Sequence, residues 1–400
     1  MKKFFVDIYY VWWNELKVVF KDPAVILLFF IVPLAYPLIY AYIYNNEVAQ
    51  HVPIVAVDDS RSAKGREFIR MVDASPDVNV VARAANMEEA REMLRREEVY
   101  SILYLPNDFS KRIGRTEQVP VFVYADMSSM LFYKASVLSV TEASLKMGAD
   151  IRVSEMEHGT QAQDEASMQA VKYEWIPFYN TPNGFASFFV PAVLILIIQQ
   201  TLVLGISTLV GTHNDRKTFT VASLVAYGKN VNAVGLTIGK AFCYSSLYLI
   251  VSVWILRVIP YIFNLPQIGD PVTIMAFVFP YLLAATFFSM TISYFASQRE
   301  FSMLLFTFTS VLLIFLTGIS WPWTAMPGAL KAIAYIFPST PGVHAFVKIN
   351  TMGATLYDVG FEITVLWIQT LFYCVLASLM YRWWIRNYDP RFKGQLVPGK

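Results

Sequence analysis

Residues 24–44 read AVILLFFIVPLAYPLIYAYIY, an apolar stretch without a single charged side chain. A helix that crosses the hydrocarbon core of a bilayer needs about 20 such residues, because each residue advances a helix by about 1.5 Å. The length and composition of this stretch therefore predict a membrane-spanning helix. Pro33 and Pro37 lie inside it and predict a distortion, which neighbouring helices can accommodate within a membrane.

Five further apolar runs follow the first, at residues 185–210, 234–258, 272–297, 301–318 and 363–384. Each is close to the length of a span. Apolar residues make up 56% of the 400 residues and charged residues only 16%, which is more apolar surface than a soluble protein of this size can bury. The sequence therefore predicts an α-helical integral membrane protein with six transmembrane helices.

The charges divide the chain into two parts. Residues 45–183 carry 15 basic and 21 acidic side chains, a net charge of −6, whereas the remainder carries 17 and 9, a net charge of +8. Basic side chains gather before the first run, between the second and third, and after the sixth, for example Lys21, Lys217 and Arg386. Because loops rich in Lys and Arg stay in the cytoplasm, we predict that both termini are cytoplasmic and that residues 45–183 lie outside.

The insert at residues 45–183 has the pattern of an α/β domain. Short apolar runs predict strands at 53–57, 78–82, 100–105 and 119–124. Helices are predicted at 63–72, from Asn86 onward, at 106–114 and over about 128–156, with Asn86 and Glu89 in the spacing of a capping box. The alternation of strands and helices predicts an extracytoplasmic α/β domain inserted between the first two spans.

The insert lacks the sequence motifs of an enzyme. It has no glycine-rich phosphate loop, no cluster of metal ligands and no Gly-x-Ser-x-Gly turn. Asp58 and Asp59 are adjacent carboxylates, but neighbouring side chains on an extended segment point in opposite directions, which favours a helix cap beside a solvated residue. Cys243 and Cys374 both lie in apolar runs, which excludes a disulfide framework in the insert. We predict no catalytic residue, and no cofactor, metal or nucleic acid bound by this chain.

Few charged side chains lie within the predicted spans. Lys240 lies about one turn into the third span, Arg257 near its other end, and Glu362 at the mouth of the sixth. An ionisable group deep in a membrane marks a functional site, but a group near a span end more often anchors the helix at the interface. We therefore expect all three to be interfacial anchors. Gly235 and Gly239 form a small-xxx-small pair, which permits close contact between helices.

Four passages resemble those of a known family. Residues 15–23 read ELKVVFKDP before the first span, and residues 102–110 read ILYLPNDFS in the insert. Residues 317–322 and 336–341 read TGISWP and IFPSTP before the last span, and residues 211–240 join the second and third spans. With the order of the spans, these passages resemble the permease subunits of type-2 ATP-binding-cassette (ABC) exporters, in the subgroup with a large extracytoplasmic domain after the first span. Residues 213–218 depart from the pattern, because they read HNDRKT where the family commonly has a Glu/Arg cluster followed by Gly-Thr.

The resemblance implies where the parts of such a permease lie. Residues 1–44 would form a cytoplasmic amphipathic elbow helix and the first span, residues 45–183 the extracytoplasmic domain, and residues 184–400 the other five spans. A coupling loop would occupy 211–233 and an outer re-entrant region 319–360. The implied site residues are Glu15, Lys17, Lys21 and Asp22 of the elbow helix; Asp215, Arg216, Lys217, Phe219 and Ala222 for ATPase coupling; and Phe189, Trp321, Trp323 and Phe337 of an outer gate.

The chain lacks the phosphate-binding loop with which many ATPases bind and hydrolyse ATP. No Gly-x-x-x-x-Gly-Lys-Ser/Thr loop occurs, so the chain does not hydrolyse ATP by that route. The resemblance implies that a separate ABC ATPase binds ATP and Mg²⁺, and that a second copy of the chain or a related permease completes the membrane part. A periplasmic adaptor (membrane fusion) protein is a further candidate partner.

The expected function is export of an amphipathic, drug-like or lipid-like substrate across the bacterial cytoplasmic (inner) membrane. The alternative is a membrane-anchored binding, sensor or scaffold protein that uses the extracytoplasmic domain without transport. Co-purification of an ABC ATPase would distinguish the two.

Overall fold

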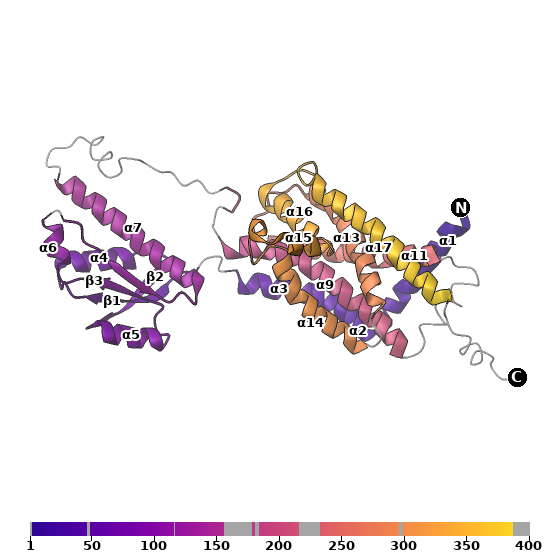
Figure 1. Cartoon of the computed structure of the whole chain (residues 1–400), viewed down its shortest axis with the longest axis horizontal. Coiled ribbons are helices and arrows are strands. Elements are labelled where there is room, and N and C mark those ends of the chain that lie inside the picture. Colours follow the sequence, from indigo (N-terminus) through magenta and orange to yellow (C-terminus); the bar gives the residue numbers. More distant parts are fainter. Residues whose placement is uncertain are drawn as a thin grey trace. The chain divides into compact units, whose positions relative to one another are not determined.

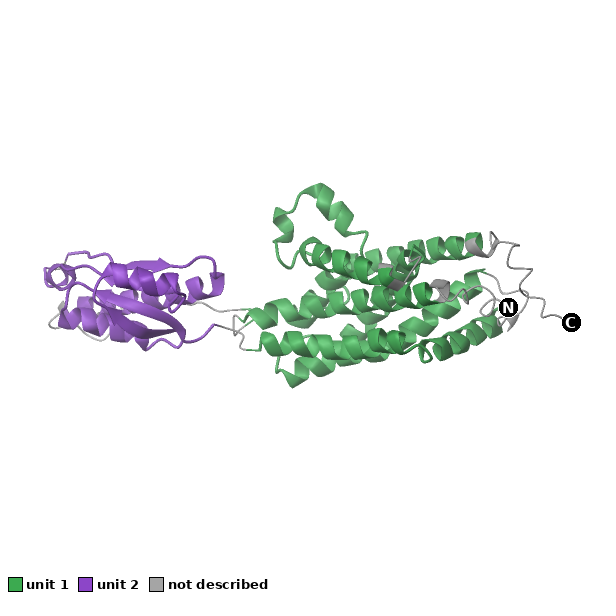
Figure 2. Cartoon of the chain, turned by 90° about the horizontal axis from the view of Figure 1, so that it is seen from below, with its two compact units in different colours: residues 1–45, 178–400 green, residues 46–177 purple. Residues whose placement is uncertain are grey.

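The computed structural model describes residues 2–45, 49–115, 117–155, 178–180, 184–215, 233–295 and 299–386 (Figure 1). The chain forms two compact units. Unit 1 comprises Met1–Asn45 and Phe178–Lys400, and unit 2 comprises Asn46–Pro177 (Figure 2).

Unit 1 is helical. It begins with α1 (Lys2–Val19), α2 (Pro23–Ile26), the π-helical turn η1 (Leu27–Ile31) and α3 (Val32–Ile43). Its long helices are α9 (Phe185–Asp215), α11 (Ala233–Val253), α13 (Pro271–Ser293), α14 (Arg299–Leu316) and α17 (Gly360–Arg386). The shorter elements are η2 (Trp254–Val258), α12 (Ile259–Ile262), η3 (Trp323–Ala325), α15 (Gly328–Ala334) and α16 (Ser339–Met352).

Five helical segments in the described part of the chain are long and apolar enough to cross a membrane: Pro23–Ile43, Phe185–Thr212, Ala233–Ile262, Pro271–Ser293 and Gly360–Trp383. They agree with five of the six predicted runs. The remaining run corresponds to α14, whose apolar part, Ser302–Leu316, is shorter than the other segments. The protein is therefore an α-helical, multi-pass membrane protein.

Two prolines account for the two π-helical turns. A proline inside a helix lacks an N–H group, and its ring presses against the carbonyl four residues earlier. Pro33 comes just after η1 and Pro260 just after η2, so in each case the turn before the proline is widened. The Leu256 carbonyl, four residues before Pro260, accepts a hydrogen bond of 2.8 Å from Gln267 Nε2. The distortion predicted in the first span thus takes the form of a π-helical turn.

The core of unit 1 forms around α9. Of the most apolar stretch of this helix, within Phe185–Thr212, 94% is buried. A helix that is apolar on all sides must be covered on all sides. The Tyr281 hydroxyl on α13 donates a hydrogen bond of 2.6 Å to the Ile195 carbonyl on α9. On α16, a Cβ added to Gly342 would lie 2.6 Å from the Tyr281 ring, so this glycine is needed for the close approach. Tyr281 therefore holds α9, α13 and α16 together.

Unit 2 contains a four-stranded sheet with strand order β2-β1-β3-β4. The strands β1 (Val52–Asp58), β2 (Val78–Ala84) and β3 (Ser101–Leu105) are parallel, and β4 (Phe122–Ala125) pairs with β3 in the antiparallel direction. All four predicted strands are confirmed, although β4 begins three residues later than predicted.

Helices cover both faces of this sheet. On one face, Ile54 and Leu103 pack with Phe68 of α4 (Ala63–Asp73) and Val140 of α7 (Met130–Glu155). On the other face, Val55 and neighbouring strand residues pack with α5 (Met87–Arg95). Successive residues of β1 therefore serve two separate cores, as expected for a central strand whose side chains alternate between faces. The short helix α6 (Phe109–Ile113) lies beside α4.

Side chains fix the turns of unit 2. Asn86 caps α5, because its Oδ1 accepts a hydrogen bond of 2.8 Å from the Glu89 amide, as predicted. The expected cap at Asp58 or Asp59 is wrong, since Ser62 caps α4. Asp58 instead accepts hydrogen bonds from the turn after β1, and Asp59 accepts one from the Tyr104 hydroxyl. Among the described residues, no group of three or more His, Cys, Asp or Glu is arranged to hold a metal ion.

Candidate functional site

Helix α1, which is predicted to be the elbow helix, packs directly on α11 (Figure 1). A Cβ added to Gly239 of α11 would lie 2.7 Å from Val11 and 3.0 Å from the Ile8 carbonyl, so the two backbones approach closely at this position. At Gly235, one turn earlier, an added Cβ would make only an ordinary contact of 3.6 Å with Phe4. The close contact that the glycine pair permits is therefore made with α1, chiefly at Gly239.

A buried ion pair joins the same two helices. Lys240 Nζ lies 3.1 Å from each carboxylate oxygen of Glu15, and the two side chains are only 4% and 3% exposed. The Tyr244 hydroxyl also donates a hydrogen bond to Glu15 Oε1. Lys240 Nζ also lies 6.0 Å from the centre of the ring of Tyr381, a residue of α17. We call Glu15, Lys240, Tyr244 and Tyr381 the elbow contact.

The elbow contact corrects the prediction for Lys240. An interfacial anchor keeps its ammonium group in water, whereas the Lys240 side chain is only 4% exposed and is paired with a carboxylate. Removing a charge from water costs several kcal/mol, so a buried lysine requires a partner of opposite charge. That partner lies 225 positions earlier in the chain, beyond the reach of local sequence patterns.

The other predicted elbow residues have different positions. Lys17 Nζ lies 5.3 Å from the centre of the Trp13 ring, and Lys21 is exposed. Asp22 is buried and caps α2, because its Oδ1 accepts a hydrogen bond of 3.0 Å from the Ala24 amide. Of the four residues, the elbow contact therefore includes Glu15, while Asp22 sets the start of the first span.

The predicted coupling residues lie at or beyond the end of α9. Asp215 is the last residue of that helix. Arg216, Lys217, Phe219 and Ala222 lie outside the described residues.

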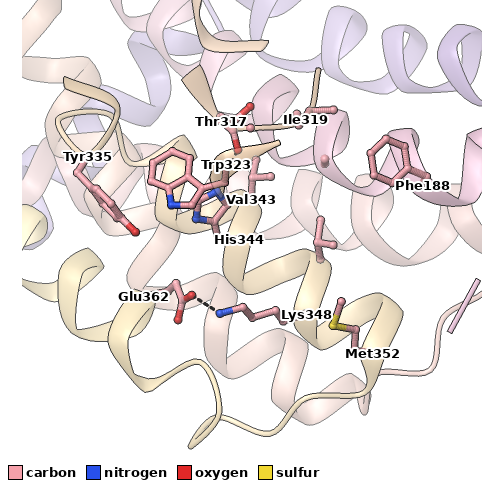
Figure 3. Close-up of a pocket in the computed structure, with 13 residues that line it drawn as sticks. Phe188, Thr317, Ile319, Trp323, Tyr335, Val343, His344, Lys348, Met352 and Glu362 are labelled. Atoms are coloured by element: carbon pink, nitrogen blue, oxygen red, sulfur yellow. Dashed lines mark hydrogen bonds and ion pairs between the residues drawn. The ribbon is translucent and has the colours of Figure 1, made fainter. Parts of the chain in front are cut away.

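A cavity of about 390 Å³ lies among α9, α16, α17 and the segment that follows α14 (Figure 3). We call it the α16 cavity. Its walls are mainly apolar and aromatic, and its polar side chains include His344, Lys348 and Glu362. The volume is within the range of about 300–1,000 Å³ that is typical of small-molecule sites.

The turn after α14 shapes one wall of this cavity. Gly318 has φ +80°, a left-handed conformation that favours glycine, and it follows the last turn of α14. His344 Nε2 donates a hydrogen bond of 3.0 Å to the Thr317 carbonyl, which can only accept. The Trp323 ring stands perpendicular to the His344 ring, with centres 4.6 Å apart. These contacts hold the turn against α16.

An ion pair lies at the other end of the cavity (Figure 3). Lys348 Nζ of α16 lies 2.6 Å from Glu362 Oε1 of α17. The Glu362 side chain is only 6% exposed, so its prediction as an interfacial anchor is wrong for the same physical reason as that of Lys240. Glu362 could be recognised in the sequence as a charge at the mouth of a span. Its partner Lys348 could not, because α16 was not predicted as a helix.

The four residues predicted for the outer gate make different contacts within the chain. Trp323 lines the α16 cavity, whereas Trp321 is 58% exposed. Phe189 stacks on Phe185, and Phe337 packs edge-to-face on Phe288. Phe188, the neighbour of Phe189, is the aromatic residue of α9 that lines the cavity. Helical geometry explains this result, because adjacent residues of a helix face directions about 100° apart.

Comparison with known proteins identifies a family. No curated protein sequence matches the chain significantly. The profile of the "ABC-2 family transporter protein" family matches residues 23–379, which include every described helix from α2 through α16 and most of α17. Proteins of this family are membrane subunits of transporters, are not themselves catalytic, and work with an ABC ATPase. The chain therefore belongs to the ABC-2 family of transporter proteins.

Proposed function

We propose that the chain is the permease subunit of an ABC exporter that moves an amphipathic substrate out of the cytoplasm or the inner leaflet. The observation that carries this proposal is the elbow contact, within a chain whose family is that of transporter membrane subunits. A buried ion pair makes α1 and α11 move as one body, because separating the two charges is costly. Such a rigid connection suits a subunit that receives movement from a partner.

The charge distribution supports a specific orientation in the membrane. Both termini would be cytoplasmic and unit 2 would lie outside the bacterial cytoplasmic membrane, in keeping with the net charge of −6 on residues 45–183. This arrangement requires six spans, with α14 as the fifth. The 18 residues of α14 extend about 27 Å at 1.5 Å per residue, close to the roughly 30 Å thickness of a hydrocarbon core.

The proposed mechanism begins at the ATPase. ATP and Mg²⁺ would bind there, and its closure would push on the coupling loop at 211–233 and on α1. The elbow contact would pass the movement of α1 to α11 and α17. Two copies of the chain would enclose the transport path, and Trp323 with the neighbouring α16 cavity would form part of its outer gate. A periplasmic adaptor would be an additional partner of unit 2.

A binding, sensor or scaffold protein without transport remains the second candidate. Unit 2 would then carry the function, and the buried connection between α1 and α11 would be only structural. The family membership favours transport. The discriminating property is an ATPase partner whose activity depends on this chain.

Cysteine labelling tests the orientation. We expect a membrane-impermeant maleimide to label Glu88→Cys in intact spheroplasts and to label Lys217→Cys only after the membrane is opened. Both variants are made in a background with Cys243→Ser and Cys374→Ser, because these two native thiols would otherwise react. Glu88 is suitable since it is exposed on α5. Equal labelling of the two positions in intact spheroplasts would overturn the proposed orientation.

A further inference from the structure

Glu362, a residue that lines the α16 cavity, has an acceptor oxygen that the protein leaves unsatisfied. Glu362 Oε1 is paired with Lys348, but Glu362 Oε2 is buried and has no hydrogen-bond partner in the described part of the chain. A buried carboxylate oxygen without a partner is costly, because it has lost its water and gained nothing in return. A ligand that donates a hydrogen bond here would recover that loss.

The present partner of Glu362 can be exchanged for another cation, while the buried carboxylate itself needs a counter-charge. The Lys348 side chain is 43% exposed, whereas that of Glu362 is 6% exposed. When Lys348 swings toward solvent, its ammonium group regains water, and the carboxylate becomes open to the cavity. The site therefore resembles an exchangeable pair, in which the buried carboxylate is fixed and the cation is replaceable.

The aromatic walls add to the preference for a cation. Trp323, Tyr335 and Phe188 all line the cavity (Figure 3). The face of an aromatic ring is negative, so it attracts an ammonium group and repels an anion. The protein itself uses one of these faces in this way, since Lys331 Nζ lies 5.9 Å from the centre of the Trp323 ring.

We propose that the α16 cavity binds an amphipathic organic cation, whose ammonium group replaces Lys348 at Glu362 and whose apolar part lies against Phe188 and Trp323. This inference rests on the proposed function, because it names the class of molecule that an exporter would hold there. An anionic amphiphile is disfavoured, because it would meet the carboxylate of Glu362.

A matched pair of probes tests the charge preference. 4-Phenylbutylammonium and 4-phenylbutanoate have similar apolar parts and opposite charges. We expect the purified full-length chain, in nanodiscs of neutral phosphatidylcholine, to bind the ammonium at least tenfold more tightly than the carboxylate in calorimetric titrations. Protein-free nanodiscs give the correction for partition of each probe into the lipid.

Substitutions of residues that line the α16 cavity test whether the ammonium probe binds there. Glu362→Gln should weaken ammonium binding about tenfold or more, since it removes a charged acceptor. Glu300→Gln, at an exposed carboxylate at the start of α14, is the control and should leave binding unchanged. Lys348→Gln should not weaken binding. Phe188→Ala should weaken it severalfold, and because Phe188 is 54% exposed this variant stays informative if Glu362→Gln fails to fold.

Two outcomes would overturn the inference: ammonium binding that is unchanged in Glu362→Gln and Phe188→Ala, or preferred binding of the carboxylate that depends on Lys348. The titration needs neither ATP nor the ATPase, so it is separable from the proposed function. If the ammonium binds but nucleotide never moves the helices, export is wrong and the site stands. If nucleotide moves the helices but the ammonium does not bind, only the site is wrong.

Discussion

Lys240→Met is expected to release the elbow helix α1 from α11 and to disconnect the ATPase from the membrane helices. The substitution leaves Glu15 buried without its counter-charge, and breaking one side of a buried ion pair costs about 3–5 kcal/mol. A loss of that size lowers the ratio of docked to undocked α1 at least about 100-fold. Maleimide labelling of Val11→Cys, in the background with Cys243→Ser and Cys374→Ser, reports the docking directly, because Val11 is fully buried in the native protein.

A double variant distinguishes the effect of an unpaired buried charge from general destabilisation of the protein. Removing both charges, with Glu15→Gln and Lys240→Met, keeps an acceptor for the Tyr244 hydroxyl and leaves no unpaired charge. We expect labelling of Val11→Cys in this background to return most of the way to the low native level. Lys331→Met removes a lysine outside the elbow contact and serves as the control. If Lys240→Met leaves Val11→Cys unreactive and ATPase stimulation intact, the elbow contact does not transmit movement.

Gly239→Ala should also displace α1, whereas Gly235→Ala should not. The methyl group added at Gly239 would lie 2.7 Å from Val11, so α1 has to move, and overpacking of this kind costs about 1–3 kcal/mol. The same change at Gly235 meets Phe4 at an ordinary 3.6 Å and gains about 1 kcal/mol of helix propensity. The melting temperature of the full-length chain is therefore expected to fall for the first variant and to stay level or rise for the second. Equal shifts in the two variants would mean that close packing at Gly239 is unimportant.

The features that the sequence predicted well are those set by local patterns. Apolar runs of membrane length identified five helical segments, and short apolar runs bounded by turn residues located all four strands. The capping of α5 by Asn86 also depends on residues three positions apart. In each case the physical cause acts within a few residues of the chain, so it is visible in the sequence.

The candidate sites depend on contacts that no local pattern reveals. Lys240 and Glu362 were each noticed, but a single charge near a span end suggests an anchor unless its partner is known. Glu15 lies 225 positions from Lys240, and Lys348 belongs to a helix, α16, that was not predicted. That helix ends at Gly353, which has φ +68°, a turn signal visible in the sequence as a single glycine.

The aromatic residues near the α16 cavity show a second feature that the sequence does not predict, namely which rings contact each other. Their clustering between the last two apolar runs suggested one gate, yet Phe337 packs into the core on Phe288 while Trp323 lines the cavity. Composition shows that aromatic rings are abundant in a segment, but only the path of the backbone decides which rings face each other.

The central claim is that ATP binding at the partner ATPase moves the membrane helices of this chain. The most direct test measures distances between spin labels at Phe188→Cys in two copies of the permease, assembled with the ATPase in nanodiscs. Labels are attached in the background without Cys243 and Cys374. Double electron–electron resonance is recorded without nucleotide and with a non-hydrolysable ATP analogue. The account predicts a shift of the distance distribution when the analogue binds, and no shift in Phe219→Asp, which places a charge in the proposed ATPase contact. An unchanged distribution in a complex shown to have bound the nucleotide would contradict it.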